Sequence, residues 1–212
     1  MSDVTPTRSV AIALKDERRT MQEGYAFLDE KCLLLAGAML REVRLFDALR
    51  RELLPLQREA MAALQAAIGR HGLNGLQCYP PSRTSEHAPR ITRRSLLGVT
   101  INEAELAGES AKAEPAFNPS PEAEHCRTAF THLLPKLTAM AALAGNLERL
   151  YQEYRRTVRR VRALQDVLLP EIGALLGEVE ARLEELEQDE ALWVRLGSTR
   201  FDGRGNPDRH AR

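Results

Sequence analysis

The sequence contains little of what builds disulfide scaffolds, membrane spans or aromatic cores. Aromatic residues make up 5% of the 212 residues, and cysteine occurs only as Cys32, Cys78 and Cys126. An odd, sparse set of cysteines argues against a disulfide scaffold and fits a reducing compartment such as the cytoplasm. No run approaches the roughly 18 apolar residues of a transmembrane helix, and the N-terminus lacks the pattern of a signal peptide. We therefore expect a cytoplasmic chain without membrane insertion.

Motifs that carry chemistry are also missing. The sequence contains no phosphate-binding Gly-x-x-x-x-Gly-Lys-Ser/Thr, no Gly-x-Ser-x-Gly, no His-Glu-x-x-His and no Cys-x-x-Cys. The five histidines match no common zinc spacing. The 30 basic and 30 acidic side chains cancel, so charge gives no reason to expect a nucleic-acid partner. The sequence thus predicts a non-catalytic chain with no metal or cofactor site of its own.

What the sequence does contain is a seven-residue apolar repeat in two long stretches, which is typical of a coiled coil. We expect a first helix within residues 1–69, with Thr5 as its N-cap and Gly69 and Gly72 as stop signals. A second helix is expected over 122–197. Two helices of matched length predict an all-α dominated fold, a long antiparallel two-helix coiled coil with both termini at one end. The predicted seam between the helices includes Tyr25, Leu28, Leu35, Met39, Phe46, Val158, Val161, Leu168, Ile172 and Leu175.

The middle segment, 70–121, differs in kind. Its "SLLGVTI" is a short, β-branched apolar run between turn-rich and Pro-rich stretches, which favours a strand. We expect a small β-hairpin and a flexible loop at the far end of the helices, with Leu97, Gly98, Val99 and Ile101 in the β element. Residues 198–212 are expected to be a disordered tail.

A proline lies inside the second helix, in "RRVRALQDVLLPEIGALLGEVE" (159–180). In a helix interior, Pro170 removes a backbone donor and crowds the carbonyl of Asp166, at a cost of about 3 kcal/mol. The apolar repeat nevertheless continues, with Ile172 at a and Leu168 at d of the heptad, which places Pro170 at f. We expect Pro170 to kink the helix and leave its contact face uninterrupted.

Three stretches in the correct order resemble the D subunit of the V-type (V/A-type) ATPases and ATP synthases. They are "PTRSVAIALKDERRTMQEGYAFLDEKCLLL" (6–35), "LLGVTI" (96–101) and "RRVRALQDVLLPEI" (159–172), which contains the proline. The sequence departs from the family pattern at Arg162 and Gln165, where Asn and Glu are usual, and at Asn102, where Pro is common.

The resemblance implies a central rotor shaft, present once per complex, that transmits torque between an A/B hexamer and a membrane ring. The implied partners are the A, B and F subunits and the adaptor of the ring, on the cytoplasmic side of the plasma membrane. ATP would be bound by the partner subunits and not by this chain. The residues expected to face the hexamer are Arg8, Lys15, Arg18, Arg19, Arg182 and Arg195.

Two other classes remain open from the sequence. One is the stalk-like helical hairpin of a type III or flagellar export ATPase, although such rods are usually shorter and lack an element like "LLGVTI". The other is an independent coiled-coil scaffold, which would dimerise through its own seam. The heptad repeat alone does not separate these classes.

Overall fold

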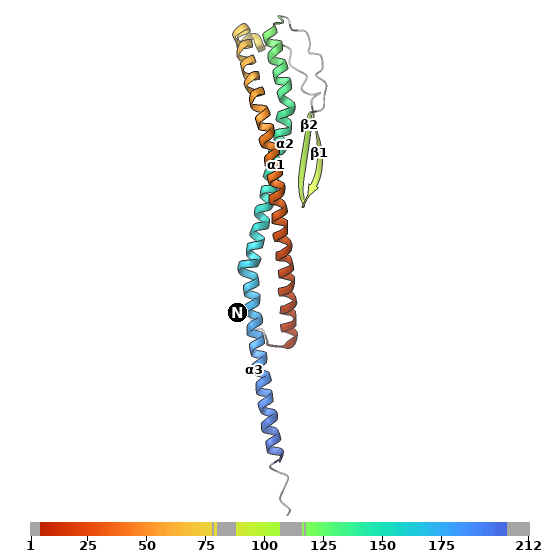
Figure 1. Ribbon diagram of the computed structural model, residues 1–212, viewed down its shortest axis with the longest axis vertical. Helices are drawn as coiled ribbons and strands as arrows, with labels where there is room; N and C mark the ends of the chain where they lie inside the picture. The colour runs from red at the N-terminus through yellow and green to blue at the C-terminus, as the bar shows by residue number, and fades with distance from the viewer. Residues whose placement is uncertain (1–4, 78, 80–87, 107–115, 117, 203–212) are drawn as a thin grey trace, which may run out of the picture. The chain divides into compact units, whose positions relative to one another are not determined.

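The computed structural model describes residues 5–77, 79, 88–106, 116 and 118–202, with side chains through residue 196. The elements in chain order are α1 (Arg8–Gln77), β1 (Pro89–Leu96), β2 (Val99–Leu106), α2 (Pro121–Ala163), a π-helical turn (Leu164–Leu168) and α3 (Leu169–Asp202) (Figure 1). The predicted all-α dominated fold with a small β-hairpin is confirmed. The predictions for the middle loop and the last part of the tail fall outside the described residues.

The chain divides into two compact units. The terminal unit comprises Met1–Glu30 and Val158–Arg212, and the middle unit comprises Lys31–Thr157. Within each unit, a stretch of α1 packs against helix from the C-terminal half of the chain. None of the helices in the described part of the chain has an apolar stretch long enough to cross a membrane.

The ends of α1 differ from those predicted. Its N-cap is Thr7, whose hydroxyl accepts a hydrogen bond from the Val10 N–H at 3.3 Å, and the prediction of Thr5 was wrong. The first backbone hydrogen bond of the helix runs from the Ala11 N–H to the Thr7 carbonyl at 3.1 Å, so Thr7 and not Thr5 occupies the cap position. Gly72 has φ 68° and ψ 164°, which breaks the helical path and suits a residue without Cβ. Helical turns resume beyond it and end at Gln77.

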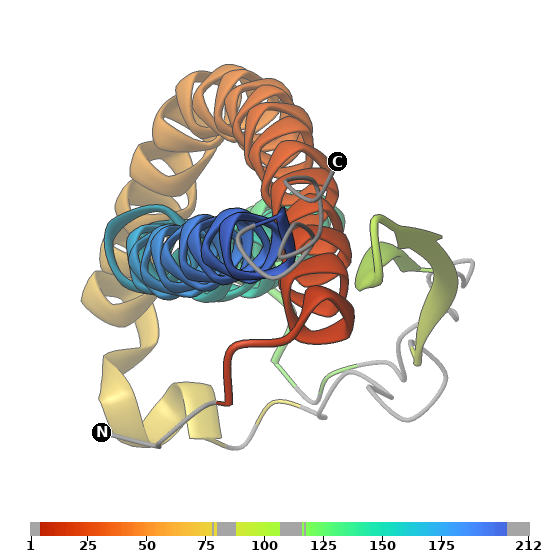
Figure 2. The same ribbon diagram turned by 90° about the horizontal axis from the view of Figure 1, so that it is seen from below.

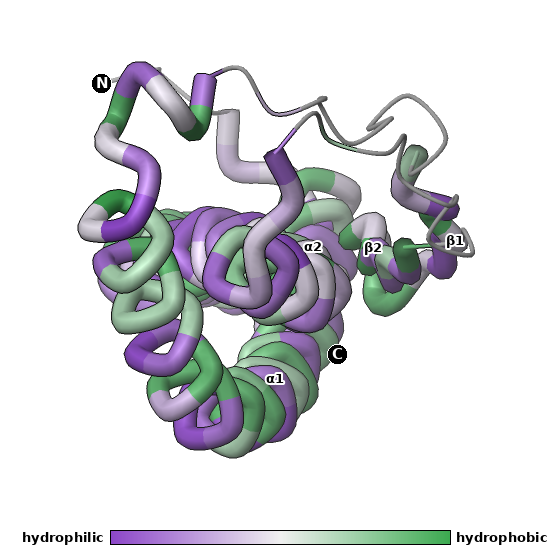
Figure 3. Tube along the Cα trace, turned by 90° about the horizontal axis from the view of Figure 1, so that it is seen from above, coloured by the Kyte–Doolittle hydropathy of each residue, from purple (hydrophilic) through white to green (hydrophobic). Residues whose placement is uncertain are grey.

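In the middle unit, α1 and α2 run antiparallel and pack through two apolar clusters. One contains Leu53, Ala60, Ala63, Ala129 and Leu133. Small alanines at the contact allow the two helix backbones to approach closely. Along α1, hydrophobic and hydrophilic residues follow one another in short stretches (Figure 3).

The second cluster of the middle unit includes the β-hairpin. Strands β1 and β2 pair antiparallel around Leu97 and Gly98, whose φ values of 53° and 84° are those of a tight primed turn. Of the two strands only β2 has buried residues, Val99 and Ile101, which pack with Leu35, Ala38 and Leu150 of the helices. The far-end position expected for Leu97, Gly98, Val99 and Ile101 was therefore wrong. A two-stranded hairpin needs an apolar surface to be stable, and it finds one about halfway along α1.

The start of α2 is held to the region of the Gly72 break. The Ser120 hydroxyl caps α2 by accepting the Ala123 N–H at 3.2 Å, and it also hydrogen-bonds to the His71 Nε2. The Tyr79 hydroxyl donates to the Asn118 carbonyl, and its ring contacts the His71 ring edge-on. These bonds close the end of the middle unit, beside the buried Ala67 and Ala123.

In the terminal unit, the first turns of α1 lie beside α3 (Figure 2). Ala11, Leu176 and Val179 form the buried cluster, with Val10, Leu14 and Leu183 packed against it. The ion pairs Arg8–Glu187 and Lys15–Glu180 join residues seven apart in opposite directions, so the two helices run antiparallel.

The π-helical turn shifts the buried face of the terminal unit by one residue. Leu164–Leu168 is π-helical, and the Leu169 N–H donates to the Leu164 carbonyl, five residues back. Ile172, Leu176 and Val179 are buried beyond it, whereas the predicted seam residues Leu168 and Leu175 are 39% and 40% exposed. The assignment of Leu168 and Leu175 to the seam was therefore wrong. Heptad spacing from the buried Val161 leads to Leu168 and Leu175. Because a π-turn contains one residue more than an α-turn, Leu169 and Leu176 take their places.

Candidate interaction surfaces

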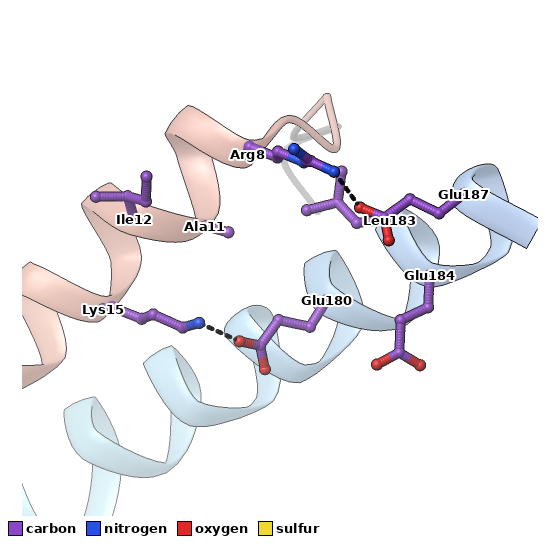
Figure 4. Close-up of a pocket in the computed structure, with 8 residues that line it drawn as sticks. All are labelled: Arg8, Ala11, Ile12, Lys15, Glu180, Leu183, Glu184 and Glu187. Carbon is purple, nitrogen blue, oxygen red and sulfur yellow. Dashed lines mark hydrogen bonds and ion pairs between the residues drawn. The ribbon is translucent and has the colours of Figure 1, made fainter.

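Two cross-helix ion pairs frame a shallow groove in the terminal unit (Figure 4). The Arg8 Nη2 lies 2.6 Å from the Glu187 Oε1, and the Lys15 Nζ lies 2.7 Å from the Glu180 Oε1. The hydrogen bond to Glu187, together with the charge of that carboxylate, raises the pKa of the Arg8 guanidinium. Since all four side chains are exposed, these pairs define the helix register more than they stabilise the unit. The groove is lined by Arg8, Ala11, Ile12, Lys15, Glu180, Leu183, Glu184 and Glu187.

The six basic residues predicted to face a partner are all exposed, but most have acidic neighbours. Arg8 and Lys15 are the cations of the cross-helix pairs, and Arg19 and Arg182 pair with Glu23 and Glu178 on their own helices. Arg18 and Arg195 are exposed on α1 and α3. A role of this set in partner contact stays a prediction, and at least four of the six charges already have an intramolecular counterpart.

The C-terminal end of α3 carries an apolar surface that the sequence reasoning missed. Trp193 and Val194 are 74% and 72% exposed, and both lie beyond Glu187, which pairs with the first helical residue of α1. Large exposed apolar patches of this kind mark interaction sites. We call this surface the α3 apolar end, and it consists of Leu186, Leu192, Trp193, Val194 and Leu196. The consecutive "ALWVRL" after a run of acidic residues was the available signal.

A second exposed apolar surface lies on α1 in the middle unit. Leu33, Leu40, Leu54 and Met61 are separated by multiples of seven residues, so they lie in one row along the helix. Val43 is exposed beside this row. We call these five residues the α1 flank. They were missed because the heptad reasoning assigned only the residues that face the partner helix, and a residue off that face is normally polar.

A buried asparagine attaches the hairpin to α2. Asn146 is 1% exposed, and its amide accepts the Asn102 N–H at 2.8 Å and donates to the Asn102 carbonyl at 2.9 Å. Arg149 donates to the Asn146 Oδ1 at 2.7 Å and to the Thr100 carbonyl at 2.8 Å. Two side chains of α2 thus bond to main-chain groups of Thr100 and Asn102 on the outer edge of β2. These bonds cover part of the free edge of β2, which would otherwise be open to other strands.

Acidic and basic groups join the helices near the same cluster. Glu42 is buried on α1, with its Oε2 3.5 Å from the Asn146 Nδ2. Lys31 and Glu153 form a partly buried pair at 2.6 Å. The hairpin is therefore held by a polar network as well as by Val99 and Ile101, and its position relative to α1 and α2 is specific.

The remaining predicted seam residues differ in burial. Leu35, Val161 and Ile172 are buried. Five others are half-buried, namely Tyr25, Leu28, Met39, Phe46 and Val158. Pro170 is exposed, at the start of α3.

No group of three or more histidine, cysteine, aspartate or glutamate side chains in the described residues is arranged to hold a metal ion. An antiparallel helix pair in each unit, with a β-hairpin docked on the middle one, makes this a predominantly helical protein.

Comparison with known proteins identifies the family. Residues 10–196 match the model of the ATP synthase D-subunit family, and the chain belongs to this family. The D subunit of the V-type ATP synthase of Thermotoga neapolitana is 26% identical over 88% of this chain and 93% of its own length. The D subunit of the A-type ATP synthase of Thermococcus sibiricus is 28% identical over 88% and 89%, respectively. The D subunit of the V-type ATP synthase of Deinococcus radiodurans is 23% identical over 98% and 93%. The chain is thus a component of a V/A-type ATP synthase.

Proposed function

We propose that this chain is the central rotor shaft of a V/A-type rotary ATPase and transmits torque between an A/B hexamer and the membrane ring. The α3 apolar end carries this proposal. Five large apolar side chains stay exposed on a helix that continues past the first residue of α1, which is costly unless a partner covers them.

The terminal unit suits insertion into the axis of a hexamer. Around its antiparallel helices, charged side chains of both signs alternate, and several of them are already paired. A rotating shaft must be retained and must still slip past three similar interfaces. Apolar contact at the tip and paired charges along the sides meet these two requirements, because apolar contacts are non-directional and paired charges bind weakly.

The middle unit suits the F subunit and the adaptor of the membrane ring. The α1 flank offers a row of apolar residues at heptad spacing, onto which a partner helix can pack through the same repeat. The chain itself would take no part in the chemistry of ATP, which the A and B subunits would bind. It would act on the cytoplasmic side of the plasma membrane, as one copy per complex.

Co-purification tests the proposal. The chain is co-expressed with the A, B and F subunits of the same organism, and the complex is recovered through a tag on A. We expect one copy per A/B hexamer and a change in the ATP hydrolysis rate when the chain is present. Absence from the recovered hexamer, together with a stable homodimer of the isolated chain, would instead support the scaffold class.

Two matched surface variants separate the partners. Trp193→Ser with Val194→Ser should reduce recovery with A and B and leave recovery with F intact. Leu40→Ser with Leu54→Ser should have the reverse effect. Both pairs lie on exposed surface, so unchanged helicity by circular dichroism serves as the folding control. Equal losses of A, B and F from both variants would contradict the assignment of surfaces to partners.

A further inference from the structure

We propose that the π-turn and Pro170 together set the rotation of α3 about its own axis, and that α3 carries a second apolar face for an alternative setting. This goes beyond the role of a shaft and concerns how the terminal unit is built. All the residues involved lie in that unit.

Helix α3 has two apolar faces, and in the structure one of them packs against α1. Leu169, Leu176 and Leu183, which recur every seven residues, lie on the buried side together with Ile172 and Val179. Directly before the first two leucines stand Leu168 and Leu175, which are exposed. Ile172 and Val179 border both rows. The helix therefore has one apolar face against α1 and part of a second in solvent.

The two faces are related by a simple rotation. Each face combines the row of Ile172 with one leucine row beside it, and neighbouring rows on a seven-residue wheel are about 50° apart. The Leu175 and Leu176 rows lie on either side of the Ile172 row, so bringing Leu175 to the place of Leu176 turns α3 by about 100°, which is the step of one residue in an α-helix. If the helix were α-helical throughout from Val161, Leu175 would lie two heptads later and on the same contact face. The one extra residue of the π-turn moves the contact to Leu176 instead.

Pro170 favours the wide turn for two reasons. In an α-turn its ring would crowd the carbonyl of Asp166, and a wider turn relieves this contact. The Leu169 N–H donates to the Leu164 carbonyl, five residues back, and the donor for the Gln165 carbonyl in the same pattern would be residue 170. Proline has no N–H, so it makes no such bond. The helix can therefore change from π-type to α-type hydrogen bonding at Pro170 without leaving an N–H unpaired.

Thiol labelling of the full-length chain measures the rotation. Cysteine is placed at Leu175 or, in a separate protein, at Leu176, and alkylation rates are resolved by peptide mass spectrometry. The buried Cys32 of the same chain is the internal reference. In the native background, Leu175→Cys should react at least tenfold faster than Leu176→Cys, because the first position is exposed and the second is buried.

Two further backgrounds test the cause. Pro170→Ala leaves the extra residue but removes the obstacle to an α-turn, and should lower the ratio of the two rates at least fivefold. Pro170→Ala with deletion of Val167 removes the extra residue as well. A regular helix of that length returns Leu176 to the buried side, so the native ratio should be restored.

The design distinguishes failure of folding from failure of the proposal. Helicity by circular dichroism must be retained in every background, and labelling of Cys32 must stay slow. If Pro170→Ala keeps the native ratio, the proline does not hold the rotation. If deletion of Val167 fails to restore the ratio while helicity is intact, the extra residue of the π-turn is not what places Leu176 on the buried side. Either result overturns the proposal.

Discussion

Replacing Asn146 by leucine should release the hairpin from the helices while leaving the helices folded. Leucine has a similar size but satisfies neither the N–H nor the carbonyl of Asn102, which Asn146 bonds at 2.8 and 2.9 Å. Each lost main-chain bond is worth about 1 kcal/mol, so docking should weaken by about 2 kcal/mol. That corresponds to about 30-fold more frequent opening of the hairpin.

Native-state amide hydrogen exchange measures this opening. We expect the protection of the β2 amides in Asn146→Leu to fall about 30-fold, with little change in α1 and in α2 away from the site, because a hairpin can undock without unfolding a helix. The matched control is Thr157→Val. Thr157 is equally buried on α2, but its hydroxyl bonds only to Glu153 of its own helix. Protection of β2 that falls less than threefold, or falls equally in both variants, would refute the attachment by Asn146.

Three further predictions concern stability and reactivity. Leu35→Ala removes a fully buried side chain under the hairpin and should lower the free energy of unfolding by about 2–4 kcal/mol in urea titrations, and exposed Leu33→Ala should cost well under half as much. Gly98→Val places a β-branched residue at φ 84°, so the turn should destabilise and exchange of β1 and β2 amides should accelerate, whereas Thr100→Val should leave it nearly unchanged. Burial raises the pKa of the Cys126 thiol, so its alkylation should reach half its maximal rate at a higher pH than that of a free cysteine peptide; an equal midpoint would contradict this.

The heptad repeat made the helices predictable. Seven-residue spacing of large apolar residues requires a partner helix, and the two stretches could find each other within one chain. The residues around Leu35 and Ile172 were accordingly placed on a contact face, and both are buried. The β-branched run around Val99 indicated a strand for an equally local reason, since alternation of apolar and polar residues suits one covered face.

The candidate surfaces could be predicted only in part from the heptad repeat and the charge pattern. The charged residues of the terminal unit stood out, but their pairing with Glu180 and Glu187 depends on which helix residues meet, and no local pattern states that. The α3 apolar end was missed because exposure is a property of what packs nearby. Trp193 would be a core residue if α1 began earlier in the register.

By itself, the amino-acid sequence determined the helices, the strand-forming run and the absence of catalytic motifs, because these depend on residues close together along the chain. Only the tertiary structure decided where the hairpin docks, since Asn146 and Asn102 meet across 44 positions. It also decided which leucine of each adjacent pair is buried. Leu175 and Leu176 are equally apolar, and the choice between them depends on one extra residue in a turn that is held by a hydrogen bond five residues back and by contact with α1.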